Sequence, residues 1–132
     1  MATRDELLDA AKAARVRAYA PYSLFHVGAA VETEDGSIVI GCNVENASYG
    51  LGICAERVAL TSAVAAGHKK IRAIAVAGPD GVATAPCGAC RQFIAEFDPA
   101  MPVTYTGTAF PVETDLSYLL PDSFGPHALG RE

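Results

Sequence analysis

The sequence lacks the features with which proteins bind nucleic acids or cross membranes. Lysine and arginine together number 10 against 15 acidic residues, which gives a net charge of −5 and a sequence pI of about 5.1. Lys69-Lys70 is the only adjacent basic pair, whereas a protein that grips a polynucleotide backbone shows a basic face or tract. The longest apolar runs, such as residues 27–31, are far too short to span a bilayer. We therefore expect neither a nucleic acid nor a membrane partner.

The sequence also shows no repeat, low-complexity segment or obvious linker, and we expect no signal peptide. Its first 21 residues carry three acidic side chains and no long apolar stretch, which is not the pattern of an export signal. Hydrophobic residues make up 51% and charged residues 19%, as in folded globular proteins. The mean hydropathy of +0.23 fits a protein that covers apolar surface with copies of itself. We expect one domain over residues 1–132, in the cytoplasm.

What the sequence does contain is an alternation of helix and strand patterns. Thr3 and Glu6 have the spacing of a capping box, and we expect a helix from there with Pro21 ending it. Residues 25–46 predict a β-hairpin that turns at Asp35-Gly36.

The remaining elements follow in the same alternating way. We predict helices at 54–66, from 87 to before 99, and at 114–120, with strands at 71–78 and 102–107. Helices alternating with strands favour a three-layer α/β/α sandwich around one mixed β-sheet. The order in which the strands pair cannot be read from this pattern.

Three of the four cysteines have the spacing and position of metal ligands. Cys87 and Cys90 are three residues apart at a predicted helix start, so both sulfurs can face one ion. Cys54 stands at another helix start, and helix N-termini lower thiol pKa values and so favour the ligating thiolate. Two helix N-termini directed at one point would bring three thiolates around zinc.

The number of thiolates decides what kind of zinc site this is. Three protein ligands leave a position for water, as in catalytic sites, whereas a closed structural site uses four and would have to include Cys42. In a strand, Cys42 faces away from Asn43 and Glu45. If the polar pair faces the site, Cys42 lies in the core, where a free cysteine behaves as a small hydrophobe. The closed four-cysteine module stays open as the alternative.

Glu56 and Arg57 follow Cys54 directly. At a helix start, Cys54 can point at the metal while the Glu56 carboxylate hangs beside it, although residues two apart do not share a face inside a helix. Zinc with three thiolates carries one net negative charge, so a cation nearby is required to favour ionisation of water. Arg57 is placed to donate to the thiolates.

These residues resemble a known signature. Cys-Ala-Glu at a helix start, followed by Pro-Cys-Gly-x-Cys, is that of the zinc-dependent deaminases, whose three-cysteine variant is described with a glutamate that is not a ligand. The segments "PYSLFHVGAA", "GCNVENASYGLGICAER", "RAIAVAG", "PCGACRQFIAEF" and "LLPDSFGP" are similar to those of the small cytidine deaminases that act on free nucleosides. The resemblance covers about residues 5–127 and implies a sheet of about five strands.

The resemblance also implies roles for individual residues. Glu56 would be the proton shuttle beside one zinc ion per subunit, and Arg57 and Gln92 would support the cysteines. Phe25 would pack on the pyrimidine, and Asn43 and Glu45 would bind the sugar hydroxyls. The further residues implied in substrate binding are the backbone around Ala55 together with Glu56 at the base edge and, across subunit interfaces of a homotetramer, Ala47, Tyr49 and Phe124.

The implied reaction is hydrolytic deamination of cytidine and 2′-deoxycytidine, which serves pyrimidine salvage. One departure from the family is Tyr118, because an acidic residue commonly precedes the Leu-Leu-Pro. Three alternatives stay open: a deaminase of a related aminopyrimidine nucleoside such as a nucleoside antibiotic, a polynucleotide-editing deaminase, which the acidic charge opposes, and a non-catalytic four-cysteine zinc module.

Overall fold

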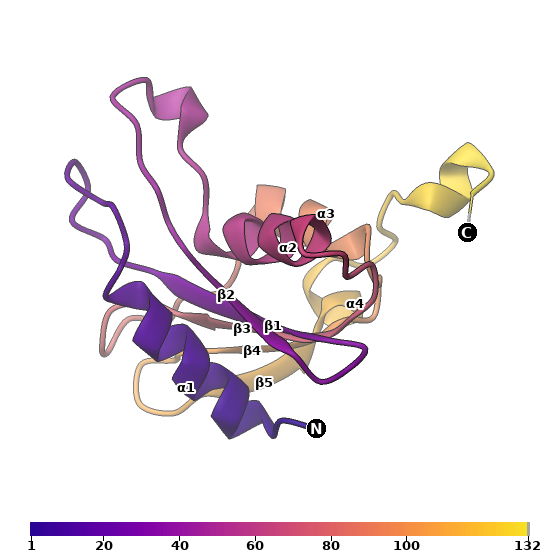
Figure 1. The fold of residues 1–132 in the computed structure, drawn as a ribbon, viewed down its shortest axis with the longest axis horizontal. Coiled ribbons are helices and arrows are strands. Elements are labelled where there is room, and N and C mark those ends of the chain that lie inside the picture. Colours follow the sequence, from indigo (N-terminus) through magenta and orange to yellow (C-terminus); the bar gives the residue numbers. More distant parts are fainter. Residues whose placement is uncertain (132) are drawn as a thin grey trace.

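The computed structural model describes residues 1–131 as a mixed five-stranded sheet with helices on both faces (Figure 1). The strands run in the order β2-β1-β3-β4-β5 across the sheet. Strands β3 and β4 are parallel, and the other neighbours are antiparallel. The predicted three-layer α/β/α architecture around a mixed sheet is therefore confirmed. The strands are β1 (Gly28–Thr33), β2 (Ile38–Cys42), β3 (Ile71–Ala77), β4 (Pro102–Tyr105) and β5 (Val112–Asp115).

The helices divide unequally between the two faces of the sheet. Helix α1 (Arg4–Arg15) covers one face alone, and α2 (Ala55–Ala65), α3 (Gly88–Ala95) and α4 (Leu116–Leu119) cover the other (Figure 1). The short 3-10 helix η1 (Tyr49–Leu51) lies in the long loop after β2. A second one, η2 (Pro126–Leu129), lies in the C-terminal segment, which extends away from the sheet (Figure 1).

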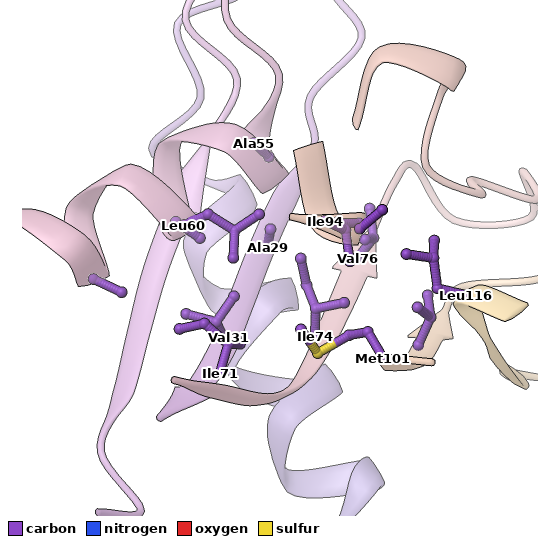
Figure 2. Packing of buried hydrophobic residues seen from close by; sticks show 14 of the residues in the cluster. Ala29, Val31, Ala55, Leu60, Ile71, Ile74, Val76, Ile94, Met101 and Leu116 are labelled. Atoms are coloured by element: carbon purple, nitrogen blue, oxygen red, sulfur yellow. The ribbon is translucent and has the colours of Figure 1, made fainter. Parts of the chain in front are cut away.

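Side chains alternate across the central strands, so each face has its own core. Under α1 the buried side chains of the sheet are alanines, such as Ala30 and Ala75. Toward α2 and α3 they are bulkier, and Val31, Ile74 and Val76 pack there with residues of the helices (Figure 2). The alternation follows from the two-residue period of a strand buried on both faces. The N-terminal ends of α2 and α3, which carry Cys54 and Cys87, lie on the bulkier side.

The first helix starts as expected and ends earlier than expected. The side chain of Thr3 accepts from the amide of Glu6, and the Glu6 side chain accepts from the amide of Thr3, which is the predicted capping box. The helix ends at Arg15, not near Pro21. Beyond it the chain is drawn into the sheet edge, because the amide of Tyr19 donates to the carbonyl of Asn43 at 2.9 Å.

The C-terminal part of the sheet also differs from the expectation. Thr114 and Asp115, predicted to open the last helix, belong to strand β5, which was not among the strands predicted from the pattern. Thr114 pairs with Val103 of β4. The helix starts only at Leu116, where the Asp115 side chain accepts from the amide of Tyr118 at 3.1 Å and caps it.

Close contact between β2 and α2 depends on Gly41. A Cβ atom at this position would lie 2.4 Å from the amide nitrogen of Ala59 and 2.6 Å from the carbonyl oxygen of Ala55, both in the helix backbone. Because backbone cannot rotate away, the helix would have to move off the sheet. This contact therefore sets the height of α2, whose first turn carries Glu56, above β2.

We expect Gly41→Ala to lower the free energy of unfolding by about 3 kcal/mol, the upper end of typical overpacking costs. Denaturant unfolding followed by circular dichroism measures it. Gly50→Ala is the control, because a Cβ at Gly50 meets nothing within 4 Å. Equal stability of the two variants would contradict this account of the helix-sheet contact.

Candidate metal centre and active site

Three cysteines from two helix starts come together at one point. The sulfur atoms of Cys54, Cys87 and Cys90 all lie within 4.8 Å of one another, and those of Cys54 and Cys87 are 3.9 Å apart. Cys90 is fully buried, Cys54 is partly buried and Cys87 is exposed. No other group of metal-binding side chains of this kind occurs within residues 1–131. The predicted three-cysteine set is thus brought together, from segments more than thirty residues apart.

The local backbone explains why these thiols are free to point at one another. Cys54 is the N-cap of α2 and Cys87 the N-cap of α3, both with extended backbone and without a side-chain capping bond. Cys90 lies three residues after Cys87 in the first turn of α3. An antiparallel bridge between Val44 and Ile53 holds the chain just before Cys54, with both amide-carbonyl distances at or below 3.0 Å. The two helix starts are therefore fixed relative to the sheet edge.

The donor set fits zinc. Tetrahedral coordination with Zn–S bonds of roughly 2.3 Å places the sulfur atoms about 3.8 Å apart, close to the 3.9 Å between Cys54 and Cys87. Three thiolates are soft ligands of the type that zinc takes. Because the set has three members, one tetrahedral position is left for water or substrate, as in catalytic zinc sites.

A guanidinium group lies against the thiols. Nη2 of Arg57 donates to Sγ of Cys54 at 3.7 Å, and this bond raises the pKa of Arg57. The pKa of Cys54 is lowered to about 5, first by its hydrogen bond with Cys90 and then by that with Arg57. Cys90, the partner that keeps the proton, has a raised pKa. Arg57 therefore supplies the positive charge that a three-thiolate zinc site requires.

Glu56 is almost fully buried beside the cysteines. It is only 4% exposed, and burial raises the pKa of its carboxyl group to about 7, with the nearby charge of Cys54 acting in the same direction. Its place in the first turn of α2, two residues after the N-cap, puts the carboxylate next to the metal ligands without making it one. A carboxyl group that titrates near neutral pH is suited to accept and return a proton.

A cavity of about 330 Å³ opens onto this pair of helix starts. Besides the metal-binding side, its wall includes Phe25, Asn43 and Glu45, which come from the loop before β1 and from the chain just after β2. The full lining is Ser23, Phe25, Val27, Asn43, Glu45, Cys54, Ala55, Glu56, Thr84, Ala85 and Cys87. The cavity thus gathers most of the residues that the sequence singles out for zinc, proton transfer and substrate binding.

Other predicted site residues lie outside this cavity. Tyr49 lines an adjacent cavity of about 320 Å³, and Ala47 lies exposed in the same loop. Phe124 is 59% exposed in the C-terminal segment, where its carbonyl accepts from the side-chain amide of Gln92 at 2.8 Å. Gln92 thereby ties α3 to this segment.

Four residues of the cavity wall were not identified from the sequence. Thr84 and Ala85 line it because they lead directly into Pro86-Cys87, and Val27 directly precedes β1. Ser23 precedes Phe25 by two residues. Their closeness in sequence to predicted site residues was the only available signal, since none of them carries chemistry that stands out alone.

Cys42 lies apart from the other three cysteines. It is not a member of the three-thiol group, and only that group has metal-binding geometry among residues 1–131. The expectation that Cys42 lies in the core is wrong: it is half-buried and belongs to neither core cluster. The reason is that β2 is an edge strand, with Ile38 and Ile40 exposed as well.

We expect Cys42→Ser to keep its zinc content and its turnover, because the sulfur of Cys42 contributes nothing to the three-thiol group. Zinc per chain, measured by atomic emission, and initial rates report this directly. Loss of zinc from this variant would instead support a closed four-cysteine site.

Comparison with known proteins agrees with this geometry. Residues 1–106 match the model of the cytidine and deoxycytidylate deaminase zinc-binding region. A cytidine deaminase of Sporosarcina psychrophila is 45% identical over 95% of this chain and 93% of its own, and one of Halalkalibacterium halodurans is 47% identical over 92% and 93%. The crystal structure of cytidine deaminase from Burkholderia pseudomallei superimposes with a TM-score of 0.88 at 53% identity, covering 93% of this chain and all of the other.

This chain therefore belongs to the zinc-binding cytidine and deoxycytidylate deaminase family. The prediction of a zinc cofactor is confirmed by the family match together with the three-thiol geometry.

None of the helices within residues 1–131 has both the length and the apolar character needed to cross a membrane.

Proposed function

We propose that the protein catalyses hydrolytic deamination of cytidine and 2′-deoxycytidine, with uridine or 2′-deoxyuridine and ammonia as products. The observation that carries the proposal is the buried Glu56 carboxylate beside a three-thiol zinc site, in one cavity with an aromatic ring and two polar side chains. A zinc site with a free coordination position can activate a water molecule for hydrolysis. The rest of the wall offers the ring of Phe25 for a flat base and the polar side chains of Asn43 and Glu45 for a hydroxylated sugar.

In this reaction Glu56 moves the protons. The chemistry that zinc supplies when bound is Lewis-acid activation of a water molecule. Glu56 accepts a proton from that water and delivers it to ring N3 as oxygen attacks C4 of the pyrimidine. It then helps to protonate the departing amino group, so one carboxylate acts first as base and later as acid. Because Glu56 is buried, the proton stays between the carboxylate and the substrate.

The remaining cavity residues bind and orient the nucleoside. Phe25 packs against the pyrimidine, and the backbone at Ala55 meets the base edge together with Glu56. Asn43 and Glu45 bind the sugar hydroxyls. Support for this comes from their shared cavity and from the polar character of the wall formed by the chain after β2.

We further propose that four copies of this single-domain chain assemble, and that neighbouring subunits complete each site. Tyr49 and Phe124 are 80% and 59% exposed, and the segment that carries Phe124 extends away from its own sheet (Figure 1). Large aromatic side chains exposed in this way suit an interface between copies. Light scattering coupled to gel filtration measures the mass of the assembly.

We place the enzyme in the cytoplasm, where it would serve pyrimidine salvage.

The decisive experiment follows ammonia release and the ultraviolet change when cytidine or 2′-deoxycytidine is added, with zinc measured on the same sample. A nucleoside antibiotic with the same aminopyrimidine ring serves as the comparison substrate. Faster turnover of cytidine supports the proposal. Faster turnover of the antibiotic would reassign the substrate, and the absence of ammonia from a zinc-loaded protein would overturn the proposed activity.

A further inference from the structure

Ser23 makes contacts that link two of the proposed substrate-binding residues. Its hydroxyl donates to Oε2 of Glu45 and also accepts from the amide of Phe25 at 3.0 Å. Ser23 lines both the cavity at the metal centre and the adjacent cavity. One small side chain therefore stands between the carboxylate assigned to the sugar and the aromatic residue assigned to the base.

The Glu45 carboxylate is largely occupied by this loop. Its Oε1 accepts from the amides of Tyr22 and Ser23 at 3.0 and 3.1 Å, and its Oε2 accepts from the Ser23 hydroxyl. A carboxylate offers about four acceptor positions, so these three bonds leave one, on Oε2. A sugar hydroxyl that binds Glu45 must then share Oε2 with the hydroxyl of Ser23.

The backbone between Ser23 and Phe25 needs a restraint. Leu24 has φ +60°, a left-handed conformation that a branched apolar residue rarely adopts. Its amide donates to the carbonyl of Ala20 at 3.0 Å, and the Ser23-to-Phe25 bond spans the residue. Removing the Ser23 hydroxyl takes away one of the contacts that hold this conformation and leaves the amide of Phe25 without its partner, while the contacts of Leu24 with Ala20 and with Nδ1 of His26 remain.

Phe25 is held from both sides by the proposed sugar-binding pair. Nδ2 of Asn43 donates to its carbonyl at 2.8 Å, while its amide is held by Ser23, which is held by Glu45. Asn43 thus acts on Phe25 directly, and Glu45 acts on it through Ser23. The same bond to Ser23 lowers the pKa of Glu45.

We propose that Ser23 is a positioning residue that couples binding of the sugar at Glu45 to placement of Phe25 against the base. The inference rests on the proposed function, since it assumes that a nucleoside occupies the cavity. The consequence of this coupling is that a substrate hydroxyl bound at Oε2 of Glu45 also fixes the ring of Phe25, which packs against the pyrimidine. Sugar and base are then recognised together and not as independent parts.

The test measures kcat and KM for cytidine in Ser23→Ala, in Glu45→Gln and in the double variant. Because the lost bond ends on a charged group, we expect Ser23→Ala to raise KM about tenfold, with kcat nearly unchanged. In the Glu45→Gln background the same change should have less than about a twofold effect, because the acceptor of the coupling is already altered. Ser23→Thr, which keeps a hydroxyl, should restore KM.

Ser117→Ala is the matched control. Like the hydroxyl of Ser23, the Ser117 hydroxyl donates to a carboxylate, here that of Asp115 at the start of α4 and outside the cavity wall. The Ser117→Ala substitution therefore removes the same kind of bond and should leave KM unchanged. If Ser23→Ala lowers kcat and raises KM equally, or if its effect is additive with that of Glu45→Gln, the coupling role is overturned.

Amide hydrogen exchange of residues 22–27, measured without substrate, separates this inference from the proposed function. Ser23→Ala should exchange faster there than the parent protein, and Ser117→Ala should not. Faster exchange in a protein that fails to deaminate cytidine would keep the loop coupling and overturn the assigned substrate. Unchanged exchange and unchanged KM in an active cytidine deaminase would overturn the coupling alone.

Discussion

Glu56→Gln should retain its zinc and lose cytidine turnover by about 10²- to 10⁴-fold, the range supplied by a positioned general acid-base group. The amide has nearly the shape of the carboxylate, so the packing around this buried position is kept. What it cannot do is accept a proton from water and return it to the base. Steady-state rates of ammonia release measure the loss, and zinc analysis on the same sample shows that the metal remains.

The size of this loss distinguishes proton transfer from substrate binding. If Glu56 served only to bind the base edge, the variant would show a raised KM and a near-normal kcat. We expect the reverse, because the proton is moved in the chemical steps. Glu113→Gln is the matched control: this carboxylate is exposed on β5 and faces Arg4 at 3.8 Å, outside the cavity wall. Normal turnover in Glu56→Gln would contradict the proposed mechanism.

Cys90→Ala should lose zinc and activity together. Cys90 is the most buried of the three thiols, and removing it leaves two ligands where a tetrahedral site needs at least three from the protein. Loss of an outer partner of a metal ligand costs up to about 100-fold in affinity, and we expect loss of the ligand itself to cost more. Zinc per chain after dialysis against a chelator is the measurement, with Tm recorded in parallel.

The comparison with Cys42→Ser makes the Cys90 result specific. Both variants remove one thiol, but only Cys90 belongs to the three-thiol group. Removal of zinc should lower the Tm of the parent protein and of Cys42→Ser, because a metal ion that binds only the folded state stabilises that state. Cys90→Ala should show no such response. A Cys90→Ala protein that keeps one zinc ion through dialysis would refute the assignment of this ligand.

The local signals of the sequence were reliable where the determining contacts are short-range. The capping box at Thr3 and Glu6, the turn at Asp35-Gly36 and the helix that starts at Cys54 all occur in the structure, because each depends on neighbours within a few residues. Helix α1 ended early because Tyr19 pairs with the segment after β2, and residues 114–115 became strand because β4 offered an open edge. Both departures come from partners distant in sequence, which override local preference.

The same division holds for the site. The chemistry and spacing of four residues can be recognised in the sequence: Cys54, Glu56, Cys87 and Cys90. The sequence by itself therefore indicated the metal and the kind of reaction, and it gave the metal ligands as a hypothesis. Ser23 has no such signature and gains importance only through the carboxylate of Glu45, 22 residues away. Strand alternation favoured leaving Cys42 out of the site, and the folded chain decided it by bringing the other three thiols together without Cys42.

The types of the functional groups and their short spacings along the chain can thus be read directly from the sequence. Distance and burial are properties of packing. The approach of α2 to β2 at Gly41 sets the depth of Glu56, and burial in turn moves the pKa of that carboxyl group to about 7. The sequence determined which groups could act on a substrate beside the zinc site. The tertiary structure decided which of them share one cavity, because only the folded sheet brings two helix starts and the loop around Ser23 and Phe25 to the same edge.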